Sequence, residues 1–113
     1  QRRLAEAGSP AIAVASHPGV SSTELGRHMN PLIGLLFLPL LLIQNTSAEG
    51  ALPSLMAATA GDVSGGDYFG PRGFAEMSRS AKKVPTVPAS KDEADAARLR
   101  QVSEALTGVT YEF

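Results

Sequence analysis

The chain has 113 residues, with 10 Lys and Arg, 11 Asp and Glu, and a net charge of −1 at pH 7. This length suits one domain, and the near-neutral charge excludes the broad cationic surface that nucleic-acid binding requires. There are no cysteines, and the 2 histidines have no carboxylates at metal-binding spacing. We therefore expect no disulfide, no metal and no nucleic-acid partner.

The first segment, residues 1–8 (QRRLAEAG), is typical of the end of a helix, with Gly8 at the position of a left-handed cap. No N-cap residue precedes Gln1, so we expect an N-terminal portion of the protein to be absent from this chain. The lack of cysteine fits a reducing compartment, and we expect a cytoplasmic protein.

Residues 11–16 (AIAVAS) are small or β-branched apolar residues, bounded by Pro10 and by the sequence His17-Pro18-Gly19. This pattern predicts a strand buried on both faces, as in parallel sheets covered by helices. A buried helical segment has a similar composition, but the flanking Pro and Gly favour a strand. Beside such a strand, His17 is expected to be a hydrogen-bonded structural residue rather than a base.

The segment HPGVSSTEL, residues 17–25, directly follows the predicted strand. Ligands of open α/β sheets bind beyond the carboxyl ends of the strands. Gly19 lets a ligand approach the backbone, Pro18 stiffens the turn, and Thr23 offers a hydroxyl group. This combination suits a planar polar group such as a carboxamide. The alternative is an ordinary loop with a helix N-cap at Ser22 or Thr23.

Residues 31–43 (PLIGLLFLPLLLI) are the most apolar part of the chain. A membrane span needs about 20 such residues. This run is shorter and contains Pro31, Gly34 and Pro39. We expect a buried or pocket-lining helical segment broken near Pro39, and membrane contact remains an alternative.

Residues 46–60 are predicted to form an amphipathic helix. Thr46 and Glu49 have the spacing of a capping box. Pro53 conflicts with a regular helix, so we expect a kink there or a later start. The predicted apolar face consists of Ala48, Ala51, Leu52, Leu55 and Thr59.

A second strand is predicted at residues 67–69, within a glycine-rich segment. The connection from residues 11–16 contains a helix, which suits a parallel crossover. Residues 74–90, with two prolines, are expected to be irregular.

A final helix is predicted to begin at Ser90, with Glu93 completing a second capping box. Gly108 is placed to end it. A narrow apolar stripe runs along it, made of Leu99, Val102 and Leu106.

Together these segments resemble the short-chain dehydrogenase/reductase superfamily. HPGVSSTEL resembles the Pro-Gly-x-x-x-Thr segment after the sixth strand of that family, EGALPSLMAAT the following helix, GGDYFGP the seventh strand, and RLRQVSEALTGVTY the closing helix. The four matches, in this order, are most like the retinol-dehydrogenase-like branch and cover residues 1–111. Arg100 departs from the pattern, because that branch often has an aromatic residue there.

The implied fold is α/β: the C-terminal part of a Rossmann-like doubly wound parallel sheet, with its last two strands, crossover helices and closing helix. Residues 1–113 would be the C-terminal portion of a single NAD(P)-binding domain. The resemblance implies that Pro18, Gly19 and Val20 line the nicotinamide and that Thr23 binds its carboxamide. Residues 25–43 would form a substrate lid.

The resemblance implies hydride transfer between NAD or NADP and an alcohol or carbonyl substrate, which the apolar lid suggests is hydrophobic. The family's glycine-rich turn, catalytic Ser and Tyr-x-x-x-Lys would lie upstream, so no residue here is expected to be catalytic. We expect this chain alone to be inactive and to need the N-terminal portion to fold. Alternatives are a non-catalytic binding module of the same fold and a membrane-associated protein using residues 31–43. Homo-oligomer formation is left open.

Overall fold

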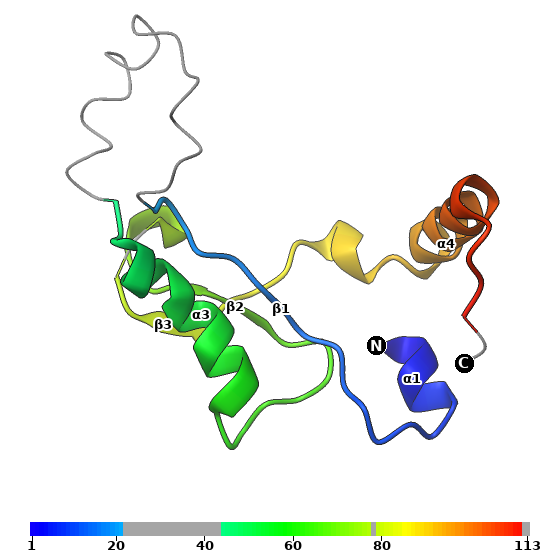
Figure 1. Cartoon of the computed structure of the whole chain (residues 1–113), viewed down its shortest axis with the longest axis horizontal. Coiled ribbons are helices and arrows are strands. Elements are labelled where there is room, and N and C mark those ends of the chain that lie inside the picture. The colour runs from blue at the N-terminus through cyan, green and yellow to red at the C-terminus, as the bar shows by residue number, and fades with distance from the viewer. Residues whose placement is uncertain (22–43, 78, 112–113) are drawn as a thin grey trace, which may run out of the picture.

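The computed structural model describes residues 1–21, 44–77 and 79–111 (Figure 1). This part of the chain is mixed α/β, with a three-stranded sheet of order β1-β2-β3. The elements are α1 (Arg2–Glu6), β1 (Ala15–Ser16), α3 (Ser47–Thr59), β2 (Tyr68–Pro71), the 3₁₀ helix η3 (Phe74–Glu76), β3 (Ala81–Lys83), the 3₁₀ helix η4 (Pro88–Lys91) and α4 (Glu93–Thr107).

The sheet combines one parallel and one antiparallel pairing. β1 and β2 are parallel, with Ser16 opposite Phe69, which confirms the predicted pairing across a helical connection. β3 is antiparallel to β2, with Lys83 opposite Phe69. The expectation that residues 74–90 are irregular is therefore wrong. β3 is too short and too polar to produce an alternating pattern, and lysine is typical of an edge strand.

The first strand is shorter than expected. Of the predicted residues 11–16, only Ala15–Ser16 are β-strand, and both are exposed rather than buried on two faces. α3 is the helix that packs on β1 and β2 within the described ranges. Because burial on both faces needs a helical layer on each side, a strand covered on one side stays partly open. The core instead centres on Phe69, which is 0% exposed.

The capping box that begins α3 is confirmed. The Glu49 amide donates to Thr46 Oγ1 at 3.2 Å, and the Thr46 amide donates to Glu49 Oε2 at 2.8 Å. The helix runs through Pro53 without a later start.

The side of α3 that is buried differs from the predicted apolar face. Gly50 and Pro53 are buried, whereas the predicted residues Ala48, Ala51, Leu52, Leu55 and Thr59 are exposed. Gly50 faces the segment after β1, where an added Cβ would overlap the Ser21 side chain. A compact helix surface therefore allows the close approach, which apolar periodicity alone does not detect.

The closing helix begins later than predicted. Ser90 lies in η4, where its hydroxyl donates to the Val87 carbonyl, so the expected cap at Ser90 is wrong. Asp92 caps α4 instead and accepts from the Asp95 amide at 2.9 Å. Gly108 ends the helix with a φ of 69°, as predicted.

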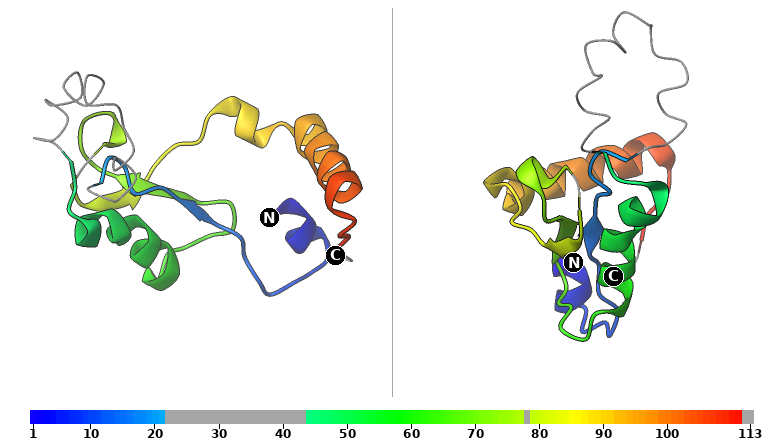
Figure 2. Two further views of the ribbon diagram at one scale, coloured as in Figure 1. Left: turned by 45° about the horizontal axis from the view of Figure 1, so that its top comes forward. Right: turned by 90° about the vertical axis from the view of Figure 1, so that its left-hand side faces the viewer.

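α4 lies with α1 at one end of the molecule, away from the sheet and α3 (Figure 2). Its predicted apolar stripe is exposed, and Leu106 reaches 81%. Within the described residues, the element that α4 packs on most is η4.

Asp67, the residue before β2, connects this strand to Ser64 and to Lys83 of β3. Its carboxylate accepts from the Ser64 amide at 2.8 Å and lies 2.9 Å from the Lys83 ammonium group. The backbone hydrogen bond from Ser64, and then the Lys83 interaction, lower the pKa of Asp67. The charged form of Asp67 therefore stabilises the junction between β2 and β3.

Asp67→Asn is expected to lower stability at neutral pH, and the difference from wild type should shrink on acidification. Because the folded pKa is depressed, the contribution is fully present above the unfolded pKa of about 3.9 and is lost as pH falls through the folded value. Chemical denaturation of both proteins between about pH 7 and 3 measures this effect. Asp62→Asn is the control, because the Asp62 side chain is 78% exposed and lies 3.4 Å from Lys83. A pH-independent difference for Asp67→Asn would contradict the explanation.

Candidate functional site

The turn formed by residues 17–21 lies at the carboxyl end of β1. Figure 1 shows this end of β1 beside the first turn of α3. Pro18 is exposed, and Gly19 and Val20 are half-buried. The three predicted site residues thus follow the carboxyl end of β1 and remain at least partly exposed. Thr23 and the lid expected at residues 25–43 lie outside the described residues.

Backbone hydrogen bonds fix the turn from two sides. The Val20 amide donates to the Met77 carbonyl at 2.7 Å, and the Asn45 amide donates to the Val20 carbonyl at 2.7 Å. The Ser21 hydroxyl donates to the Pro18 carbonyl at 3.1 Å. Segments distant in sequence therefore form hydrogen bonds with both the amide and the carbonyl of Val20.

The Asn45 side chain adds a third connection. It is 2% exposed. Its Nδ2 donates to the Pro18 carbonyl at 3.3 Å, and its Oδ1 accepts from the Arg79 amide at 2.8 Å. Sequence reasoning missed Asn45, because an asparagine just before a helix cap looks like an ordinary loop residue.

Gly19 has both a conformational and a steric reason to be glycine. Its φ is +68°, in the left-handed region that side chains disfavour. An added Cβ would also overlap the Met77 carbonyl oxygen and lie 2.7 Å from the Pro71 side chain. The close neighbour of Gly19 is thus the protein's own backbone.

His17 occupies the hydrogen-bonded structural role expected of it. Its Nδ1 accepts from the Gly19 amide at 3.3 Å, and its Nε2 lies 3.2 Å from Glu76 Oε2. Because Nδ1 accepts a hydrogen bond, the tautomer that fits both contacts has its hydrogen on Nε2, which donates a hydrogen bond to the Glu76 carboxylate. The imidazole also lies against Tyr68, with ring centroids 5.3 Å apart. His17 therefore connects Gly19 of the turn to Glu76 of η3.

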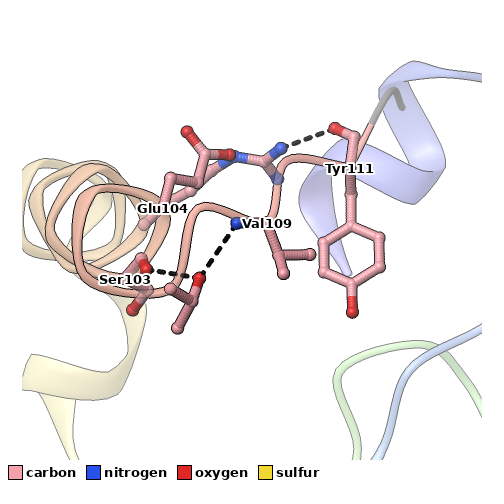
Figure 3. A pocket seen from close by; sticks show the side chains of 6 residues that line it. Ser103, Glu104, Val109 and Tyr111 are labelled. Atoms are coloured by element: carbon pink, nitrogen blue, oxygen red, sulfur yellow. Dashed lines mark hydrogen bonds and ion pairs between the residues drawn. The ribbon is translucent and has the colours of Figure 1, made fainter.

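Two of the cavities that the described residues form lie outside the turn. One, of about 630 Å³, runs along β1 and β2, and its lining includes Glu76. The other, of about 320 Å³, lies at the end of α4 (Figure 3). There Arg100 Nε lies 2.6 Å from Glu104 Oε1, and Arg100 donates to the Tyr111 carbonyl. The residue that departs from the family pattern thus ties the C-terminal tail to α4.

Neither a metal centre nor a membrane span is present in the described ranges. No group of three His, Cys, Asp or Glu residues there could hold a metal ion. No helix there is long and apolar enough to cross a bilayer. The apolar residues 31–43 lie outside those ranges.

Two relatives match the chain by sequence. Retinol dehydrogenase 14 of Mus musculus is 35% identical over 100 residues, which cover 82% of this chain and 27% of the relative. Retinol dehydrogenase 14 of Homo sapiens is 34% identical over 100 residues, covering 82% and 26%. The chain thus spans about a quarter of the length of these curated relatives. No family model and no solved structure matches it.

A parallel strand pair joined across a helix, within a three-stranded mixed α/β sheet, is consistent with part of a Rossmann-like fold. With its sequence relationship to retinol dehydrogenases, the chain belongs to the short-chain dehydrogenase/reductase superfamily, on its retinol-dehydrogenase-like branch.

Proposed function

We propose that the complete protein is an oxidoreductase that transfers a hydride between NAD or NADP and a hydrophobic alcohol or carbonyl compound. The observation that carries this proposal is the 35% identity to a retinol dehydrogenase across 82% of the chain. Retinol is itself a hydrophobic alcohol. The proposal includes a cytoplasmic location and a substrate lid at residues 25–43.

The turn after β1 has properties that suit the nicotinamide end of the cofactor. The amides of Gly19 and Val20, and the carbonyls of Pro18 and Val20, are all hydrogen-bonded within the protein. A turn with satisfied backbone groups is rigid, and it presents mainly ring and aliphatic carbon to a ligand. A flat aromatic ring fits such a surface, and the hydrogen bond to its carboxamide would come from Thr23.

When bound, the cofactor would supply the hydride acceptor or donor. Pro18, Gly19 and Val20 would hold the ring in place and exclude water from one side. The proton that accompanies the hydride is assigned to no residue of this chain. The catalytic Ser and Tyr-x-x-x-Lys implied by the resemblance belong to the upstream part of the protein.

The test uses the complete protein, titrated with NADH and with NADPH and then assayed with retinol and the oxidised cofactor. Binding of NADH or NADPH, together with reduction of the matching oxidised cofactor as retinol or a similar apolar alcohol is oxidised, supports the proposal. Binding without turnover of any apolar alcohol or aldehyde would favour the non-catalytic binding module. Absence of binding to both cofactors would overturn the proposal.

Thr23→Val is expected to weaken cofactor binding about ten- to a hundredfold, because the carboxamide loses a partner worth about 1–3 kcal/mol. Stability should hardly change. Thr23→Ser retains the hydroxyl and should bind nearly as wild type does. The measurement pairs the cofactor Kd with the melting temperature. A variant with lower stability and unchanged Kd would show that Thr23 is only a helix cap, whose loss costs about 1 kcal/mol.

A further inference from the structure

Asn45 is the buried polar side chain of the described residues. A buried amide is stable only when its polar atoms are hydrogen-bonded. Asn45 meets this requirement by joining the Pro18 carbonyl to the Arg79 amide. It is thus a bridge between the turn after β1 and the segment after η3.

The bridge needs a side chain that donates and accepts at the same time. Nδ2 donates at 3.3 Å, and Oδ1 accepts at 2.8 Å. A carboxylate keeps the acceptor but lacks the donor, and it would repel the Pro18 carbonyl. An amide side chain at position 45 therefore matches both partners.

The same residue also holds the turn through its main chain, because its amide donates to the Val20 carbonyl. Arg79, whose amide donates to Asn45 Oδ1, has a left-handed backbone conformation with a φ of 78°. A non-glycine residue persists in that conformation only where its surroundings hold it. The contacts of Asn45 thus constrain two residues of the turn, Pro18 and Val20.

We propose that Asn45 is a positioning residue for the nicotinamide end of the cofactor site. It contacts the turn from behind and sets where Pro18 and Val20 meet the ring. This inference rests on the proposed function. Loss of the bridge would displace the turn, and the adenine, ribose and phosphate parts of the cofactor would bind as before.

The experiment compares two probes on the complete protein and its Asn45→Asp variant. The first is the reduced cofactor that wild type binds. The second is the same molecule without nicotinamide: ADP-ribose, or its 2′-phosphate if NADPH is the cofactor. We expect reduced-cofactor binding to weaken at least about tenfold and ADP-ribose binding to stay unchanged. A purely structural role would weaken both probes in parallel or neither.

Thr46→Ala is the matched control. It removes the cap of α3 next to Asn45 and should lower the melting temperature without changing the ratio of the two dissociation constants. If Asn45→Asp does not fold, Asn45→Ser keeps a small donor and acceptor and should shift the ratio in the same direction. If wild type binds the cofactor and the folded variant has an unchanged ratio of the two dissociation constants, the role of Asn45 is overturned and the proposed function is not. A wild type that binds neither NADH nor NADPH overturns the proposed function and this role together.

Discussion

Gly19→Ala is expected to destabilise the complete protein by about 2–4 kcal/mol, because a left-handed alanine and an overpacked contact both oppose folding. The added Cβ would overlap the Met77 carbonyl oxygen, which also accepts the Val20 amide. Relief of the overlap therefore breaks a hydrogen bond of the turn. We expect cofactor affinity to fall with stability. Chemical denaturation and cofactor titration measure the two effects.

Gly108→Ala separates the two causes. Gly108 has a φ of +69°, but an added Cβ there meets nothing within 4 Å. Its substitution should therefore cost only the conformational part, about 1 kcal/mol, and leave cofactor affinity unchanged. Equal destabilisation by the two substitutions would show that the approach of Met77 to Gly19 has no energetic consequence.

Phe69→Ala is expected to cost about 3–5 kcal/mol of folding free energy, the range for an aromatic side chain deleted from a core. Phe69 is 0% exposed and lies in the central strand of the sheet. Its carbonyl also accepts a hydrogen bond from the amide of His17, the first residue of the turn. Urea denaturation of the complete protein measures the loss.

Phe74→Ala provides the comparison with the same chemical change. Phe74 is 85% exposed, so its removal should alter stability by no more than about 0.5 kcal/mol. Similar losses for the two variants would mean that Phe69 does not centre the core.

Features that depend on a few neighbouring residues could be predicted from the sequence. The capping box at Thr46, the left-handed glycines Gly8 and Gly108, and the turn Pro18-Gly19 all belong to this group. Each follows from local backbone geometry, in which a hydroxyl caps an amide or a missing Cβ permits a positive φ. The parallel pairing also followed, because a helical connection between two strands strongly favours it.

Features set by contacts between distant segments could not be predicted. Asn45 gains its role only when residues 18 and 79 meet it. The buried side of α3 is set by how closely Gly50 approaches Ser21, so apolar periodicity pointed to the wrong face. At Ser90, the capping pattern was present, but a competing cap at Asp92 prevailed.

The two outer strands of the sheet differ in how they would meet a strand from another molecule. β3 carries Lys82 and Lys83, and the Lys83 ammonium group is already paired with Asp67. An incoming strand would have to align beside these charges and strip water from them, which disfavours edge-to-edge aggregation. β1 offers only Ala15 and Ser16, which carry no charge. We therefore expect any strand added to this sheet to pair with β1, which is also the strand that leads into the turn.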